Sequence, residues 1–392
     1  MTVNELREKR NTAWENAKDF LETHRMENGL ISAADAKTYE KMVQDIQSYG
    51  EEIARLEQLQ SMEDTLRRPT AAPLTSRPGS KAGRASDEYK NALLTALRTN
   101  FKDVDSILTA ADVAAGNMEG ALADEGETTK KGGKFSYSFR VPTRYGKLIA
   151  DAGFDFMSMA NNHAFDFGLD GVKSTEATLH SNGIAYSGIG GRKESAIVER
   201  NGIRYGFCAF GHNSYTLKHA DLENVKRIIG NLREKADIVI VSFHGGAEGT
   251  AHKHLPQGKE MFLGENRGDL RNFAHFCIDN GADVVYGHGP HVVRAVELYK
   301  NHFIAYSLGN FCTPYGVNIS GISGYAPVLQ LTVNAADGTF VGGKINSFIQ
   351  QRGKGPHRDP LNLVAKEIRS LTNADFSNPK LTIANDGTIS KR

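Results

Sequence analysis

Polar residues able to bind a metal ion or transfer a proton follow four apolar runs of this chain. The runs cover residues 111–116, 154–159, 238–243 and 282–286. The residues that follow them are Asn117, Glu119, Asn161, Asn162, His163, His244, Glu248, His288 and His291. Side chains at the carboxyl ends of parallel strands converge on one edge of an α/β sheet, so we expect these residues to form one site. Such nitrogen and oxygen ligands suit Mn, Fe or Zn.

The segment 161–163 carries the sharpest local signal, two amides and an imidazole in succession. Burying such groups requires several hydrogen-bond partners, so packing alone rarely selects them. The amide of Asn162 can ligate a metal ion, and His163 can act as a general acid toward a substrate oxygen. The alternative is an Asx turn that caps the next helix.

Two histidines lie on the turn Gly-His-Gly-Pro-His at residues 287–291. The glycines allow a sharp turn and the proline stiffens it, so His288 and His291 are expected to face one ion. His244 also follows a short apolar strand and is a further candidate ligand. Glu248 is expected either to orient a ligand or to contact substrate.

Three residues have weaker signals, because their types are common in loops. Asn117 and Glu119 are candidate site residues only because they follow a predicted strand. Asn310 lies in a polar turn, residues 307–311, which either lines the pocket or caps a strand. We expect four residues to contact substrate, namely Asn117, Asn161, Glu248 and Asn310.

Composition excludes several classes of protein. With 47 basic and 46 acidic residues, the chain has no overall attraction for nucleic acid. Its three cysteines lack CxxC spacing and are expected to be buried free thiols. There is no P-loop and no nucleophile elbow. We also expect no membrane span and a cytoplasmic location, since no long apolar run and no signal sequence are present.

The first 66 residues predict a charged helical segment. Thr2 and Glu5 form a capping box for a helix ending near His24, and Ser32 and Asp35 form a second box. A heptad seam follows, which predicts pairing with another helix in this chain or in a second copy. The alternative is a surface helix packed on its own domain. The seam comprises Tyr39, Met42, Ile46, Tyr49, Ile53 and Leu56.

The rest of the chain divides into four segments. A Pro/Gly/Ser-rich linker is expected at 67–86, a short helix at 87–104, a domain at 105–350 and a polar tail at 351–392. Within the domain, helices are predicted at 142–152, 171–181, 222–235 and 267–280. Hairpins are predicted at Asn201-Gly202 and Asp337-Gly338. Strands alternating with helices, plus hairpins, imply a layered α/β sandwich.

Five motifs resemble the CapA family of capsule (poly-γ-glutamate) synthesis proteins, within the calcineurin-like metallophosphoesterase superfamily. They are Asn-Met-Glu-Gly, Ala-Asn-Asn-His-Ala-Phe-Asp-Phe-Gly, Ser-Phe-His-Gly-Gly-Ala-Glu, Gly-Ala-Asp-Val-Val-Tyr-Gly-His-Gly-Pro-His-Val and Ile-Ala-Tyr-Ser-Leu-Gly-Asn-Phe. The resemblance covers about residues 105–350. It implies a four-layer αββα fold, one or two divalent ions, and a polymer or phosphoester substrate. CapA-like proteins usually act at the cell envelope. The residues implicated are Glu119, Asn162, His163, His244, His288 and His291.

The chain departs from this family at its start. Family members open with an apolar strand ending in Gly-Asp, whose aspartate binds metal, and no such strand precedes Asp112. We therefore expect a sandwich lacking its first strand and an incomplete metal site. Asp103, Asp105 or Asp112 would be the substitutes nearest in sequence.

Residues 1–104 resemble a different class, the N-terminal scaffolding segment of tailed-phage major capsid proteins. The resemblance rests on residues 2–10, the heptad helix, the linker and residues 84–101. It implies a leader that drives assembly and self-associates. Two functions therefore stay open: a CapA-like metal-dependent hydrolase impaired by loss of the aspartate, or a non-catalytic capsid-related assembly protein or chimeric fusion.

Overall fold

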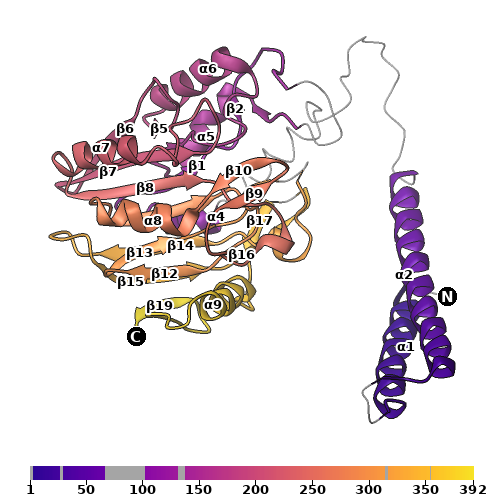
Figure 1. Ribbon diagram of the computed structural model, residues 1–392. Helices are drawn as coiled ribbons and strands as arrows, with labels where there is room; N and C mark the ends of the chain where they lie inside the picture. The colour runs from indigo at the N-terminus through magenta and orange to yellow at the C-terminus, as the bar shows by residue number, and fades with distance from the viewer. Residues whose placement is uncertain (1–2, 27–29, 67–101, 131–136, 314–316, 354) are drawn as a thin grey trace, which may run out of the picture. The chain divides into compact units, whose positions relative to one another are not determined.

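The computed structural model describes residues 3–26, 30–66, 102–130, 137–313, 317–353 and 355–392. The chain divides into two compact units, Met1–Gly79 and Ser80–Arg392, and each is described by itself (Figure 1). The predicted linker at 67–86 and most of the predicted helix at 87–104 lie outside the described residues.

The first unit is a pair of helices, α1 (Val3–Thr23) and α2 (Ala33–Leu66), that pack against each other. The predicted second capping box is present: Ser32 Oγ accepts a hydrogen bond from the Asp35 amide at 3.2 Å and donates to its carboxylate at 2.6 Å. Ile53 is buried, as are Leu6 and Ala17 of α1. The helix that carries the predicted seam therefore packs against another helix of the same chain.

The second unit is a mixed α/β fold whose largest sheet has six strands in the order β12-β13-β11-β8-β7-β6. β8 pairs in parallel with both β7 and β11. A separate parallel sheet has the order β1-β4-β5. The bounds are β6 (Ser195–Arg200), β7 (Ile203–Gly211), β8 (Ile238–His244), β11 (Val284–His288), β12 (Val296–Tyr299), β13 (His302–Ala305), β1 (Ala115–Asn117), β4 (Phe156–Ser158) and β5 (Ala185–Ser187).

Helices cover these sheets close to where the sequence predicts them. α7 (Leu222–Arg233) and α8 (Leu270–Asp279) pack on one face of the six-stranded sheet, where their apolar residues join those of β8 in one core cluster. Asp221 and Asp269 cap them by accepting backbone N–H groups at 3.2 Å. The other helices and short strands are α4 (Lys102–Leu108), α5 (Gly146–Asp151), α6 (Gly168–Ser181), β2 (Ala121–Leu122), β3 (Arg140–Val141), β9 (Glu260–Phe262) and β10 (Glu265–Gly268).

Both predicted hairpins are present. β6 and β7 pair antiparallel across Asn201-Gly202, and β14 pairs antiparallel with β15 across the turn containing Asp337-Gly338. β14 and β15 belong to a four-stranded sheet in the order β14-β15-β19-β18. The remaining bounds are β14 (Val328–Val333), β15 (Phe340–Asn346), β16 (Phe348–Gln351), β17 (Gly355–Arg358), α9 (Leu363–Asp375), β18 (Leu381–Ile383) and β19 (Thr388–Lys391).

The last forty residues differ from the expected polar tail. They complete the four-stranded sheet and form α9, whose Val364, Ile368 and Leu371 are buried in the core. These positions follow helical spacing, but they are separated by polar residues that mask the pattern in a short helix. No helix within the described part of the chain is long and apolar enough to cross a membrane.

A substitution in α9 tests whether the C-terminal residues belong to the core. Replacing Ile368 by alanine should lower the free energy of unfolding by about 2–5 kcal/mol, because it deletes buried methylene groups and leaves a cavity. Leu361→Ala is the matched control, since Leu361 is 63% exposed. Urea unfolding measures both, and equal midpoints would contradict a buried α9.

Candidate metal centre

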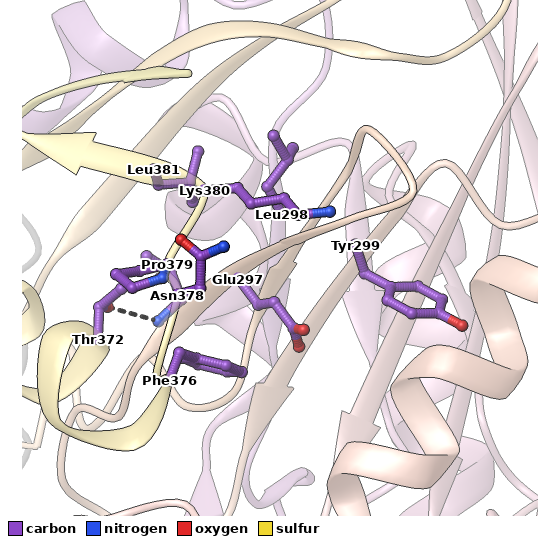
Figure 2. A pocket seen from close by; sticks show the side chains of 10 residues that line it. Glu297, Leu298, Tyr299, Thr372, Phe376, Asn378, Pro379, Lys380 and Leu381 are labelled. Carbon is purple, nitrogen blue, oxygen red and sulfur yellow. Dashed lines mark hydrogen bonds between the residues drawn. The ribbon is translucent and has the colours of Figure 1, made fainter. Parts of the chain in front are cut away.

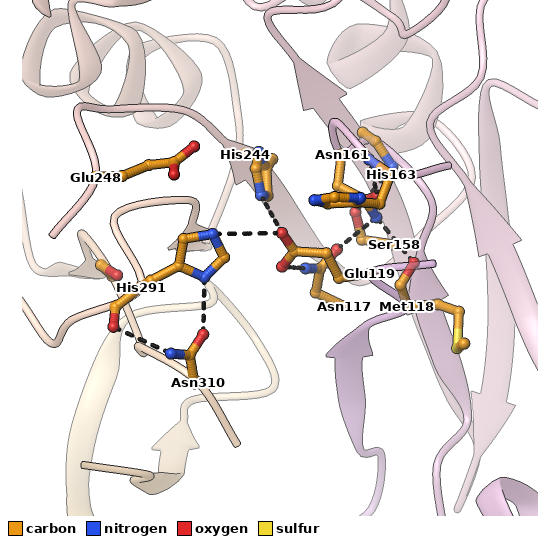
Figure 3. Close-up of polar contacts among 12 residues, drawn as sticks. Asn117, Met118, Glu119, Ser158, Asn161, His163, His244, Glu248, His291 and Asn310 are labelled. Carbon is orange, nitrogen blue, oxygen red and sulfur yellow. Dashed lines mark hydrogen bonds and ion pairs between the residues drawn. The ribbon is translucent and has the colours of Figure 1, made fainter. Parts of the chain in front are cut away.

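Glu119 lies at the centre of the candidate site, two residues beyond the end of β1 (Figure 3). Its Oε1 atom is 3.3 Å from Nε2 of His244 and 3.7 Å from Nε2 of His291. Its Oε2 atom accepts a hydrogen bond from Nδ2 of Asn117 at 3.1 Å. One carboxylate therefore joins residues from three distant stretches of sequence.

Strand register brings the histidines to the same edge. His244 and His288 are the last residues of β8 and β11, and they are direct partners in the parallel pairing. The turns beyond them are tied together, because the Gly245 amide donates to the His288 carbonyl at 3.0 Å. Gly289 has φ +123°, and a Cβ built there would lie 2.3 Å from the Gly245 carbonyl oxygen. Only glycine allows this close approach.

The Asn161–His163 segment is held by its own amides. Asn161 Nδ2 donates to Oδ1 of Asn117 at 3.0 Å and to the Met118 carbonyl at 2.9 Å. Asn161 Oδ1 accepts the His163 amide at 3.1 Å, which is an Asx turn. This turn does not cap α6, whose N-terminal residue has no side-chain cap. The turn instead orients the segment toward Glu119.

His163 is positioned by three residues that the sequence reasoning missed. Its Nδ1 atom is 2.8 Å from Oδ2 of Asp166, which is fully buried. Lys130 pairs with the other oxygen of Asp166 at 2.6 Å. The Phe139 ring lies 4.1 Å from the imidazole, centroid to centroid. Asp166 lies inside a quoted motif, so its i+3 spacing from His163 was the available signal.

The electrostatics of the cluster keep Glu119 ionised. Burial by itself raises the pKa of Glu119, but the imidazoles of His291 and His244 outweigh it and hold that pKa well below its usual value. Burial lowers the pKa of His288 to about 4, with a further contribution from His244. Burial also lowers the pKa of His291, yet the charge of Glu119 reverses this and raises it.

Three buried atoms of the proposed ligand residues have no hydrogen-bond partner. They are Oδ1 of Asn162, Nδ1 of His244 and Nε2 of His288. Buried acceptors are rarely left without a partner, and all three are of the kind that ligates divalent metals. Within the described residues, however, no group of three or more His, Cys, Asp or Glu side chains is already arranged to hold an ion. The residue types are ones that ligate metals in proteins, and in their present arrangement they form an ion-pair cluster.

The predicted substrate-contacting residues have protein partners. Asn117 and Asn161 belong to the network around Glu119. Asn310 contacts His291. Glu248 pairs instead with the buried Arg267 at 2.9 Å, and its charge also acts on His291. Their contact with substrate stays a prediction.

His212 is a buried residue beside the site that the sequence reasoning did not select. Its side chain is 3% exposed and its ring lies 6.0 Å from that of His244. It directly follows Gly211, the last residue of β7, which pairs with His244. Applying the strand-end rule to β7 would have found it.

The proposed substitutes for the missing aspartate do not follow strands. Asp112 accepts a hydrogen bond from Asn201 at 2.6 Å, just before β7 begins. His244 pairs with the last residue of β7, so Asp112 lies at the opposite end of that strand. Asp103 and Asp105 lie on α4.

A pocket elsewhere in the second unit contains none of the predicted site residues (Figure 2). It lies beside β12, where Thr372 accepts the Val296 amide at 3.0 Å. Its one carboxylate, that of Glu297, already accepts from Tyr306 at 2.6 Å and contacts His275 at 2.9 Å. The lining residues are Val296, Glu297, Leu298, Tyr299, Thr372, Phe376, Asn378, Pro379, Lys380 and Leu381.

Comparison with known proteins identifies the family. The family described as bacterial capsule synthesis protein PGA_cap matches residues 61–315, and the chain belongs to it. The chain is 29% identical over 231 residues to the PGA biosynthesis protein CapA of Bacillus subtilis, covering 55% of this chain and 57% of that protein. It is 27% identical over 234 residues to the capsule biosynthesis protein CapA of Bacillus anthracis, covering 55% and 54%. The chain thus spans little more than half the length of these relatives.

A solved structure is also similar, that of a hypothetical protein from Thermus thermophilus. It has a TM-score of 0.38 and 20% identity, covering 67% of this chain and 94% of that one.

A buried ion pair holds two of the site's loops together. Arg294 is fully buried and donates to both oxygens of Glu260, at 2.8 and 2.7 Å. It also donates to the carbonyls of Ala247 and His252, at 3.3 and 2.9 Å. The segment after His291 is thereby fastened to the loop after His244.

Breaking this pair should destabilise the protein strongly. Arg294→Met should cost about 3–5 kcal/mol of unfolding free energy, because it leaves Glu260 buried without its cation. The control is Arg227→Met, which breaks a pair with Glu194 whose side chains are 48% and 41% exposed. Arg227→Met should lower the unfolding free energy much less, because exposed pairs are screened by water. Denaturant titration compares the two variants. Similar losses of unfolding free energy would contradict a stabilising role of the Arg294–Glu260 pair.

Proposed function

We propose that this chain is a CapA-like capsule or poly-γ-glutamate synthesis protein that binds one or two divalent ions, Mn, Fe or Zn, in a metallophosphoesterase-type site. The residues that would hold the metal are Glu119, Asn162, His244, His288 and His291. The observation that carries the proposal is the meeting of Glu119 with His244 and His291. The unpartnered acceptors of Asn162 and His288 support it further.

The proposed chemistry is hydrolysis of a phosphoester or of a polymer linkage. The metal, when bound, supplies a Lewis acid that polarises the scissile group and activates water. His163 donates a proton to the leaving oxygen, and Asp166 orients the ring through the 2.8 Å contact between its Oδ2 and Nδ1 of His163. Lys130 balances the charge of Asp166. The Asx turn of Asn161 fixes the backbone of His163.

The missing first-strand aspartate sets the proposed limit on activity. A metal site that loses one anionic ligand binds its ion less tightly. Glu119 then supplies the carboxylate that contacts both His244 and His291. We therefore expect a weakened rather than an abolished centre.

Metal content and turnover test the proposal together. Purified protein supplied with Mn, Fe or Zn should retain metal by elemental analysis and should hydrolyse a chromogenic phosphodiester slowly. His244→Ala should lose both, because it removes a ligand. His180→Ala should keep both, since His180 is an exposed residue at the end of α6. The proposal would be wrong if the wild-type protein retained no metal and showed no turnover when Mn was added.

The second candidate is an assembly role for the helical leader, resembling the scaffolding segment of phage capsid proteins. The observation that favours it is that Met1–Gly79 forms a compact unit distinct from Ser80–Arg392. In this role the leader associates with further copies, whether or not the second unit is catalytic.

Light scattering on the full chain tests the assembly role. The wild type should form an oligomer, and Ile53→Glu should reduce its mass, because a charge at this buried position disrupts the two-helix unit that would associate. Glu40→Gln, on the same helix but exposed, should leave the mass unchanged. A monomeric wild type would contradict self-association.

A further inference from the structure

Asn310 holds the imidazole of His291 through its side-chain oxygen. Oδ1 of Asn310 is 2.8 Å from Nδ1 of His291. Nδ2 of Asn310 donates to the carbonyls of His291 and Ser323, at 3.2 and 3.4 Å. These two carbonyls fix the orientation of the amide, because a flipped Asn310 would point its oxygen at both of them.

The fixed amide determines which nitrogen of His291 carries the proton. An amide oxygen can only accept, so Nδ1 of His291 must donate. In the neutral ring Nε2 then carries the lone pair. In the imidazolium form Nε2 also carries a proton, which lies toward Oε1 of Glu119, 3.7 Å from Nε2. A ligand imidazole presents its lone pair in this way when an outer partner holds its other nitrogen.

The same residue also holds the backbone of His291. His291 has φ +57°, a left-handed backbone conformation that residues other than glycine seldom adopt. Its carbonyl accepts the Nδ2 proton of Asn310. Asn310 therefore contacts both the ring and the main chain of a strained residue, and it is 5% exposed.

Gln350 fixes Asn310 in turn. Nε2 of Gln350 donates to the Asn310 carbonyl at 3.1 Å, and Oε1 accepts from the Thr313 amide at 2.6 Å. Gln350 is 4% exposed and lies on β16, which pairs with β17. It also lies beyond residues 61–315, the part that matches the family.

We infer that Asn310 and Gln350 are positioning residues that keep the proton of the neutral His291 ring on Nδ1, so that Nε2 is the nitrogen that carries the lone pair. The β16–β17 hairpin is then part of the site's support. The inference concerns the imidazole itself, and only its consequence for metal affinity rests on the proposed function.

Long-range ¹H–¹⁵N NMR on the full-length, chelator-treated protein reads the tautomer directly. His291 is assigned by the signal lost in His291→Gln, at a pH where its ring is neutral. The wild type should show a protonated Nδ1. A wild-type His291 with its proton on Nε2 would overturn the inference, and this measurement needs no further variant to fold.

Variants then separate positioning from general stability. Asn310→Leu keeps the shape of the side chain and should shift His291 toward the Nε2–H tautomer, and Gln350→Leu should give a mixture. The control is Asn346→Leu, which removes a buried amide bonded to Val328 and Gln330 at 3.3 and 2.9 Å. It should leave the His291 signals unchanged. Wild-type His291 signals in Asn310→Leu or Gln350→Leu would overturn the inference.

Calorimetric titration with Mn or Zn measures the consequence for metal. Asn310→Leu should weaken binding by about 10- to 100-fold, the usual effect of removing an outer partner of a ligand histidine. Asn346→Leu should bind as the wild type does. A wild type that binds neither metal refutes the proposed function but leaves the tautomer result standing, so the two failures are distinguishable.

Discussion

The arrangement of this site depends on one carboxylate that is held among imidazoles. Taking Glu119 out of water raises its pKa, and that effect would protonate it if it were isolated. His291 and His244 reverse the outcome, and Glu119 in turn raises the pKa of His291. The pKa of Glu119 and that of His291 are thus mutually dependent. The loops that carry these two residues must be held in place for the contact between them to persist.

Three kinds of contact meet that requirement. Glycine allows the turns after β8 and β11 to touch, as the close approach of Gly289 to Gly245 shows. The buried ion pair of Arg294 and Glu260 also connects the same two loops. The amide side chains of Asn161 and Asn310 hydrogen-bond to the main chain of His163 and His291, respectively, and fix the orientation of these two histidines. Together they position histidines that lie more than a hundred residues from Glu119 in sequence.

Support for the site extends beyond the part of the chain that matches the family. The match ends at residue 315, yet Gln350 hydrogen-bonds Asn310. Residues after 315 also complete the four-stranded sheet and contribute Ile368 and Leu371 to the core. The C-terminal residues therefore contribute to both the stability of the second unit and the geometry around His291.

The sequence by itself determined the hairpins at Asn201-Gly202 and Asp337-Gly338 and the strand ends that precede Glu119 and His244. Those strands belong to two sheets, whereas the sequence predicted one edge of one sheet. The hairpins and strand ends follow from local rules, since alternation, turn residues and strand polarity are written in neighbouring positions. It left α9 in a polar tail, because the buried face of a short helix shows only against the sheet it covers. It also missed His212, Asp166 and Arg294. Their roles come from partners far away in the chain, and only tertiary structure decides which distant groups a buried charge or imidazole meets.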